Sequence, residues 1–196
     1  MNLPNKLTIL RIILVPFMVA TLLWQGLPHH YLIAGLIFGI ASFTDMLDGK
    51  IARKHNLITD FGKFADPLAD KILVVSAFCC FIDLKLMSCI PVILILFREF
   101  AVTSIRLLAV GNGKVIAANM WGKAKTVSQM VAIIFVFLAQ YFLELCDMGI
   151  LPITVSDNIN TTIYALDNSL IWISAVLTII SGIIYIKDNI HFIETK

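Results

Sequence analysis

Four aspartates lie near one another in the sequence, where one apolar stretch ends and the next begins: Asp45, Asp48, Asp66 and Asp70. Asp45 and Asp48 are three residues apart, and Asp66 and Asp70 are four residues apart. On a helix, residues with either spacing lie on the same face, about one turn apart. Two neighbouring helices joined by a short loop would therefore point four carboxylates into one small volume.

Such a cluster needs compensating positive charge. A charge at membrane depth costs roughly 2.5–3.5 kcal/mol or more, and adjacent carboxylates also repel one another. Divalent cations would remove this conflict, and ligands that are all oxygen favour Mg²⁺ or Mn²⁺. Two metal ions about 3.5–4 Å apart are a common clamp for phosphoryl transfer. The pattern therefore indicates a two-metal site.

An alternative interpretation treats the aspartates as ordinary charges at helix ends. Asp66 and Asp70 would be favourable at a helix N-terminus, where the backbone carries partial positive charge. The same reasoning fails for Asp45 and Asp48, which we expect near a helix C-terminus, where negative charge is unfavourable. We therefore favour the metal site over this alternative.

Small residues and one arginine accompany the aspartates. Gly49 and Gly62 would let the backbone and a substrate approach closely. Ala52 lies one turn beyond Asp48 and leaves that face uncrowded. Arg53 follows it and can bind a phosphate through two hydrogen bonds. The segment thus has the composition of a site that binds phosphate groups beside metal ions.

The elements that must position these residues are expected to be membrane helices. The chain of 196 residues is 59% hydrophobic and only 14% charged, whereas soluble proteins average about 45–50% apolar and about 25% charged residues. A membrane-spanning helix needs about 20 mostly apolar residues. We find six such stretches, at 7–24, 31–47, 68–84, 90–110, 127–145 and 170–186. This predicts an all-α, polytopic membrane protein with six transmembrane helices in one membrane-embedded catalytic domain over residues 1–196.

The basic residues indicate how the chain is oriented in the membrane. Outside the apolar stretches, nearly all lysines and arginines fall in the N-terminus, segments 50–66 and 111–126, and the C-terminal tail. The intervening connections contain one basic residue, Lys85. Basic loops remain on the cytoplasmic side of a membrane. We therefore expect both termini and the aspartate segment to face the cytoplasm, in a multi-pass protein of the cell membrane.

The aspartate segment reads as D-x-x-D-G-x-x-A-R, eight further residues, then G-x-x-x-D-x-x-x-D. Its fixed positions are filled by Asp45, Asp48, Gly49, Ala52, Arg53, Gly62, Asp66 and Asp70. This pattern resembles the signature of the CDP-alcohol phosphatidyltransferase family, which consists of membrane enzymes of phospholipid synthesis. We find no departure from that signature in this segment.

The resemblance implies a fold, a cofactor and roles for individual residues. It implies six transmembrane helices, usually in a homodimer, with Mg²⁺ or Mn²⁺ in a two-metal site formed by the four aspartates. Asp70 would also be the base that accepts the proton of the acceptor alcohol. Gly49, Ala52 and Arg53 would line the CDP group of CDP-diacylglycerol, the lipid substrate, from which CMP is released. Asn5, Thr8 and Arg11 could reach the cytidine or the diphosphate from the first helix.

Three further stretches, 2–17, 97–118 and 121–133, resemble the branch of this family whose acceptor is sn-glycerol 3-phosphate. An acceptor with two negative charges requires nearby cations, and the candidates for its phosphate are Arg98, Arg106, Lys114, Lys123 and Lys125. Two alternatives remain open: Arg98 pairs with Glu99, and Lys114 acts only as a topological charge. An inositol-phosphate acceptor would also need a basic pocket, and serine is a further alternative. The last apolar stretch shows no such resemblance.

Two other functional classes use carboxylates inside membranes. Intramembrane prenyltransferases also bind magnesium and a diphosphate, but their two acidic motifs lie far apart in sequence. Ion-coupled transporters would place carboxylates near mid-helix and show an internal repeat, whereas no repeat is visible here. No nucleic-acid partner is expected for this chain. The phosphatidyltransferase interpretation is therefore favoured, with membrane lipid as its environment.

Overall fold

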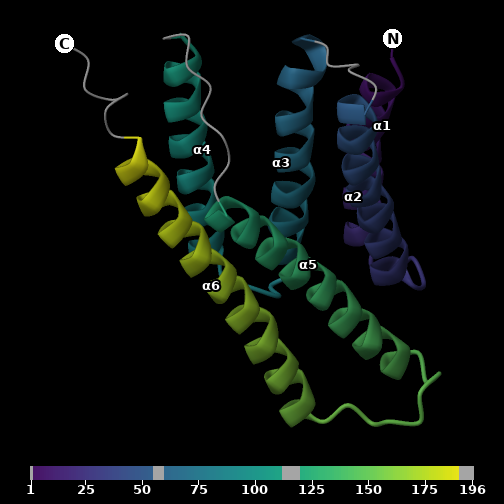
Figure 1. Cartoon of the computed structure of the whole chain (residues 1–196). Helices are drawn as coiled ribbons and strands as arrows, with labels where there is room; N and C mark the ends of the chain where they lie inside the picture. Colours follow the sequence, from purple (N-terminus) through teal and green to yellow (C-terminus); the bar gives the residue numbers. More distant parts are fainter. Residues whose placement is uncertain (1, 55–59, 112–119, 190–196) are drawn as a thin grey trace. The chain divides into compact units, whose positions relative to one another are not determined.

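The computed structural model describes residues 2–54, 60–111 and 120–189, but not the side chains of residues 3, 4, 46–54, 60, 61, 63, 64, 67, 108, 110 and 111. The described residues form six helices and no strand (Figure 1). The helices are α1 (Leu3–Leu23), α2 (His30–Lys54), α3 (Asp60–Asp83), α4 (Cys89–Gly111), α5 (Met120–Asp147) and α6 (Asp157–Asp188). The prediction of an all-α protein with six helices is confirmed.

Within the residues that the structure describes, three helices are long and apolar enough to cross a membrane by length and composition: α1 over Asn5–Leu23, α5 and α6. Charged residues interrupt the apolar runs of the other three helices, as Asp45 does in α2, Asp70 in α3 and Arg98 in α4. Large apolar side chains are exposed along the helices, including Phe97 and Phe100 of α4. In a membrane protein such side chains contact lipid instead of water.

The helices extend beyond the predicted apolar stretches. Helix α2 continues to Lys54, α3 begins at Asp60 and α6 begins at Asp157. The apolar stretches are shorter than the helices at 47, 68 and 170, because hydropathy detects the part of a helix that suits lipid and not the polar turns beyond it. Consequently Asp45 lies well before the end of α2, and Asp66 lies beyond the first turn of α3. The interpretation of these aspartates as helix-end charges loses its basis, since the helix dipole acts only over the terminal turn.

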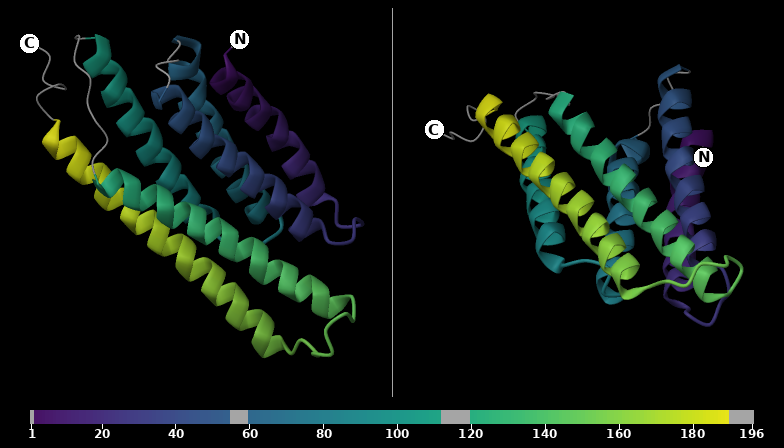
Figure 2. Two further views of the ribbon diagram at one scale, coloured as in Figure 1. Left: turned by 45° about the vertical axis from the view of Figure 1, so that its right-hand side comes forward. Right: turned by 90° about the horizontal axis from the view of Figure 1, so that it is seen from below.

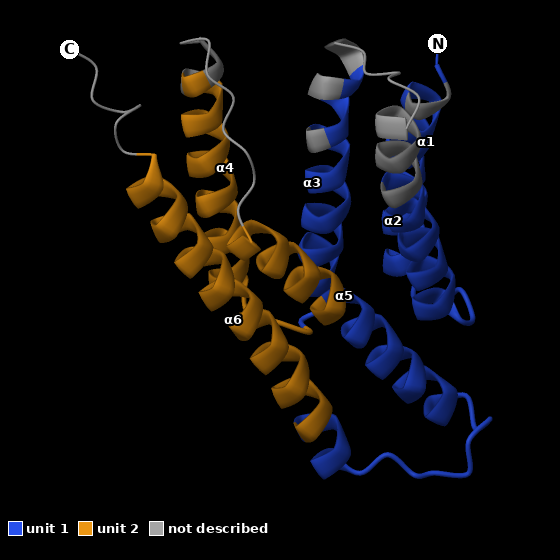
Figure 3. Cartoon of the chain, in the orientation of Figure 1, with its two compact units in different colours: residues 1–85, 133–161 blue, residues 86–132, 162–196 orange. Residues whose placement is uncertain are grey.

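Residues 1–85 and 133–161 form one compact unit (Figure 3). Here α1, α2 and α3 lie side by side in every view (Figures 1 and 2). The ring of Phe137, from α5, lies 5.8 Å from Phe38 of α2 and 5.1 Å from Phe81 of α3. Phe137 also touches the backbone of α2, since a Cβ placed on Gly35 would lie 3.3 Å from it. This aromatic cluster fixes the helices that carry the aspartates.

Residues 86–132 and 162–196 form the second unit, which contains α4, the beginning of α5 and most of α6. Its buried cluster is Val102 and Ile105 of α4 with Tyr185 of α6. The inner face of α6 is unusually polar, because Ser174, Thr178 and Ser181 are all fully buried. Gln129 of α5 donates a hydrogen bond to the Thr178 hydroxyl, at 3.2 Å. The single catalytic domain over residues 1–196 stays a prediction.

Candidate active site

Helix α1 joins the two aspartate-bearing helices. The Arg11 guanidinium lies 2.6 Å from an Asp45 carboxylate oxygen of α2. The Thr8 hydroxyl donates a hydrogen bond of 2.5 Å to the Asp66 carboxylate of α3. Thr8 and Arg11 are three residues apart and therefore share one face of α1. One face of α1 thus brings together one aspartate from each of the two predicted pairs.

The burial of these residues differs in a way that matters for chemistry. The Arg11 side chain is completely buried, whereas the Asp45 side chain is 38% exposed. Asp66 and Asp70 are both partly buried on α3. Arg11 can therefore hold Asp45 from the protein side, while part of the carboxylate still faces outward. A ligand could reach that exposed part without displacing α1.

The remaining residues of the signature are described to different extents. Asn5 is buried one turn before Thr8, and Gly62 is buried one turn before Asp66. The backbone of α2 is helical through Lys54, but four predicted side chains lie outside the described part of the structure: Asp48, Gly49, Ala52 and Arg53. Thr8, which was predicted to lie near the substrate, donates its hydroxyl hydrogen bond to Asp66.

The donor chemistry at this site fits a hard divalent cation. The available ligands are carboxylate oxygens from α2 and α3, which suit Mg²⁺ or Mn²⁺ better than softer metals. Among the described side chains, no group of three or more His, Cys, Asp or Glu residues is close enough to hold a metal. The fourth aspartate of the set, Asp48, is not among those side chains. The metal site formed by all four aspartates therefore stays a prediction.

The second unit contains most of the predicted basic residues. Arg98 is buried, and its guanidinium lies 3.1 Å from Glu99 and donates a hydrogen bond of 2.8 Å to the Ser181 hydroxyl of α6. Lys125 of α5 forms an ion pair with the same oxygen of Glu99. The structure therefore shows the alternative in which Arg98 pairs with Glu99. This contact also joins Arg98 to Lys125, a link that the sequence did not reveal.

Two other basic residues are more accessible. The Arg106 guanidinium lies 5.8 Å from the centre of the Tyr185 ring, a distance typical of a cation–π contact. Both Arg106 and Lys123 are exposed, so an anion can reach them without disrupting an internal contact. The fifth candidate, Lys114, lies outside the described residues.

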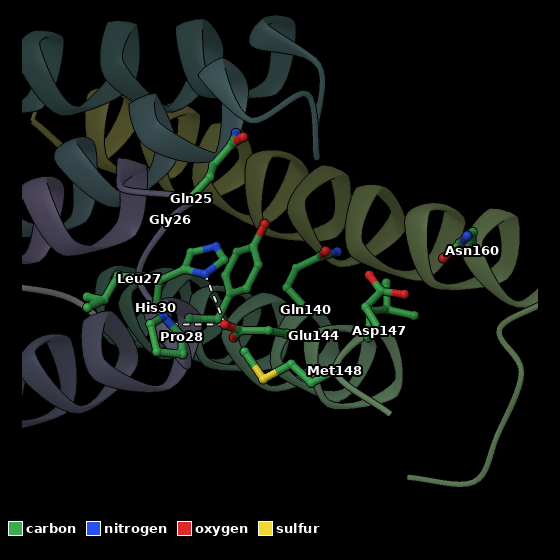
Figure 4. A pocket seen from close by; sticks show the side chains of 12 residues that line it. Gln25, Gly26, Leu27, Pro28, His30, Gln140, Glu144, Asp147, Met148 and Asn160 are labelled. Atoms are coloured by element: carbon green, nitrogen blue, oxygen red, sulfur yellow. Dashed lines mark hydrogen bonds and ion pairs between the residues drawn. The ribbon is translucent and has the colours of Figure 1, made fainter. Parts of the chain in front are cut away.

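A separate cavity of about 480 Å³ lies in the first unit, between the α1–α2 connection and the last turns of α5 (Figure 4). Within it, the backbone N–H and the ring Nδ1 of His30 each lie 3.0 Å from Glu144 Oε1. Glu144 thereby accepts the first N–H of α2 and joins that helix to α5. His30 begins α2 and Asp45 lies fifteen residues later, which is about 22 Å along a helix. This cavity is therefore distinct from the aspartate site.

The sequence model of the CDP-alcohol phosphatidyltransferase family matches residues 1–182, which contain α1 to α5 and most of α6. The chain belongs to this family. Members of the family are generally dependent on a divalent metal. The predictions of the family and of a transferase are thereby confirmed.

Three relatives illustrate the similarity. A Bacillus subtilis (strain 168) protein named CDP-diacylglycerol–glycerol-3-phosphate 3-phosphatidyltransferase is 37% identical over 206 aligned positions, covering 100% of this chain and 98% of the relative. A Rickettsia bellii protein of the same name is 38% identical, covering 95% of this chain and 94% of the relative. A Mycobacterium tuberculosis (strain H37Rv) protein named probable phosphatidylglycerophosphate synthase is 43% identical over an alignment that covers 67% of this chain and 64% of the relative.

Proposed function

We propose that the protein transfers the phosphatidyl group of CDP-diacylglycerol to sn-glycerol 3-phosphate, giving phosphatidylglycerol phosphate and CMP. The observation that carries this proposal is the convergence of Asp45 and Asp66 on one face of α1, in a chain of this family. Relatives aligned over nearly their whole length carry the name of this reaction, and this supports the choice of acceptor.

In the proposed reaction, the primary hydroxyl of glycerol 3-phosphate attacks the phosphate that bears the diacylglycerol. A new P–O bond forms to that hydroxyl oxygen while the P–O bond to CMP breaks. Asp70 accepts the hydroxyl proton, and CMP leaves as an anion. Divalent ions bound by Asp45, Asp48, Asp66 and Asp70 would neutralise the diphosphate oxygens and the leaving CMP.

Residues of α1 orient the carboxylates in this scheme. Arg11 is buried against Asp45 and keeps that side chain turned toward α1. The Thr8 hydroxyl donates to one oxygen of Asp66 and leaves the other oxygen for a metal ion. Both contacts restrict side-chain rotation before substrate binds, and such preorganisation lowers the cost of assembling a reactive site.

The remaining assignments concern the two substrates. The CDP group of CDP-diacylglycerol would lie against Gly49, Ala52, Arg53 and Gly62, with Asn5 and Thr8 nearby. The acceptor phosphate would be held by basic residues of the second unit: Arg98, Arg106, Lys114, Lys123 and Lys125. Fixed cations are required because glycerol 3-phosphate, a dianion, must approach a diphosphate that is itself negative.

The proposal also includes location and assembly. The protein would be a multi-pass protein of the cell membrane, with the aspartates facing the cytoplasm, where CDP-diacylglycerol headgroups and glycerol 3-phosphate are both accessible. The asymmetry of lysine and arginine between alternate loops supports this orientation. We further propose a homodimer, as the family resemblance implies.

The decisive experiment measures CMP release from CDP-diacylglycerol by the purified protein with a panel of acceptors. We expect glycerol 3-phosphate to support release, and serine and inositol phosphate to support little. The lipid product should contain two phosphates. Preferential use of serine or inositol phosphate would overturn the acceptor assignment, and absence of CMP release with every acceptor would overturn the proposed reaction.

A further inference from the structure

Helix α6 contacts the proposed acceptor site through a glycine. Gly182 lies against the Arg98 side chain: a Cβ placed on Gly182 would lie 2.7 Å from Arg98 Cγ and 3.5 Å from Arg98 Nε. Real Cβ atoms essentially never approach another heavy atom within 3.0 Å. Only glycine therefore lets the arginine stem lie in this place against α6.

The guanidinium beyond that stem is held in one orientation. Its Nη2 donates to the Ser181 hydroxyl at 2.8 Å, and its Nη1 lies 3.1 Å from Glu99. Its Nε is buried and has no hydrogen-bond partner among the described residues. An unsatisfied buried donor is unfavourable until an acceptor reaches it. Arg98 is thus fixed at two nitrogens, and its buried third nitrogen has no hydrogen-bond partner among the described residues.

Glu99 couples this arginine to a second cation. The same Glu99 oxygen contacts both Arg98 and Lys125, which come from α4 and α5. Two cations held this close would otherwise repel each other, and the shared carboxylate removes much of that repulsion. The cluster keeps a net positive charge, so it can still attract an anion such as a phosphate.

We propose that Gly182 and Glu99 are positioning residues for the acceptor phosphate: Gly182 makes room for Arg98, and Glu99 holds Arg98 and Lys125 together before the acceptor binds. This inference rests on the proposed function, because it assumes that the acceptor carries a phosphate. It assigns a role to α6, a helix in which the sequence revealed no functional residue.

A purely structural role for the cluster would be energetically unusual. Ion pairs buried in proteins often stabilise no better than apolar residues of similar size, because removing charges from water is costly. Here three charged side chains are largely buried within one unit of a membrane protein. Preorganisation of a binding site accounts for their presence, since cations fixed in advance lose less freedom when the anion arrives.

The test compares Gly182→Ala with Gly39→Ala in the full-length protein. Gly39 is a matched control, because a Cβ at that position of α2 meets nothing within 4 Å. We expect Gly182→Ala to raise the KM for glycerol 3-phosphate roughly tenfold or more, the loss typical of a charge-assisted contact. The KM for CDP-diacylglycerol, and kcat at saturating acceptor, should change less than twofold. Gly39→Ala should change none of these constants.

Glu99→Gln provides a second test that does not alter packing. It keeps the shape of the side chain and removes the charge that holds Arg98 and Lys125 together. We again expect a selective rise in the KM for glycerol 3-phosphate, with Glu99→Asp giving a smaller rise. This variant decides the matter if Gly182→Ala does not fold.

The outcomes separate the inference from the proposed function. If the wild-type protein does not use glycerol 3-phosphate, the proposed function fails. If it does, but Glu99→Gln leaves the acceptor KM unchanged or raises both substrates' KM values equally, the positioning role is wrong. A kcat that falls in Glu99→Gln while the acceptor KM stays constant would also contradict it.

Discussion

The contact between Arg11 and Asp45 permits a quantitative prediction. The variants are Arg11→Met, Asp45→Asn and the double mutant, all studied in EDTA so that no metal contributes. A double-mutant cycle isolates the energy of this pair from the other effects of each substitution. The pair joins α1 to α2, so its loss should appear in the stability of the folded protein.

The magnitude follows from the geometry. Exposed ion pairs contribute about 0.2–1 kcal/mol, whereas breaking a fully buried pair costs about 3–5 kcal/mol. Arg11 is completely buried and Asp45 is 38% exposed, with 2.6 Å between the charged atoms. An ion pair in this intermediate setting should contribute between these limits, about 1–3 kcal/mol. We therefore expect a coupling energy in that range.

The assay is reversible unfolding in mixed micelles, with the free energy of unfolding measured for all four proteins. A coupling energy below about 0.5 kcal/mol would refute the reasoning, because it would mean that the pair contributes no more than an exposed one. Repeating the series with Mn²⁺ adds a separate readout. The wild type should gain stability on metal addition, and Asp45→Asn should gain less, since any ligand that binds only the folded state stabilises it.

Three further predictions concern the metal, the acceptor and the topology. Asp66→Asn and Asp70→Asn should each nearly abolish CMP release while the protein stays folded, whereas Asp83→Asn, an exposed control at the end of α3, should leave CMP release unchanged. EDTA should remove the wild-type activity, and Mg²⁺ or Mn²⁺ should restore it. Full activity without metal would exclude this mechanism. Arg106→Ala and Lys123→Ala should each lower kcat/KM for glycerol 3-phosphate roughly 10- to 150-fold and leave the KM for CDP-diacylglycerol unchanged. The exposed control Lys187→Ala should not change the acceptor kinetics. Unchanged acceptor kinetics in Arg106→Ala and Lys123→Ala would mean that the acceptor phosphate binds elsewhere. In a background without native cysteines, a cysteine at position 161 should react with an impermeant reagent outside the cell and one at position 59 should not; the reverse labelling pattern would invert the topology.

The sequence predicted the helices better than it predicted the contacts between them. Six apolar stretches correspond to six helices, because hydropathy responds strongly to long apolar runs. The helices are longer than these stretches where polar turns continue a helix, as in α2 and α6. The pairing of Arg11 with Asp45 depends on how α1 and α2 pack, and spacing within one helix carries no information about that packing.

The acceptor region was harder to predict, because the sequence left the pairing of Arg98 with Glu99 open and gave no sign of the contacts that Arg98 makes with α6. Arg98 and Glu99 are adjacent, and adjacent residues on a helix do not face each other. They nevertheless meet, because the long arginine side chain is turned by its contact with Ser181 of α6. Gly182 gave no sequence signal at all, since a glycine in an apolar helix is common in membrane proteins.

The distribution of charge between the two units follows from the chemistry proposed for them. In the first unit, aspartates outnumber the one buried arginine beside them, so the cluster retains negative charge that metal ions can balance. In the second, arginines and lysines outnumber Glu99, so the cluster retains positive charge that an anion can balance. Each cluster also contains a residue of opposite charge, Arg11 or Glu99, which holds like-charged neighbours in place at a lower electrostatic cost. Full neutralisation by the protein would leave neither cluster able to bind its ligand, and no neutralisation would make each too costly to bury in a membrane. Partial compensation satisfies both requirements, and this supports the proposed role of Arg11 and Glu99 in orienting the charged groups around them.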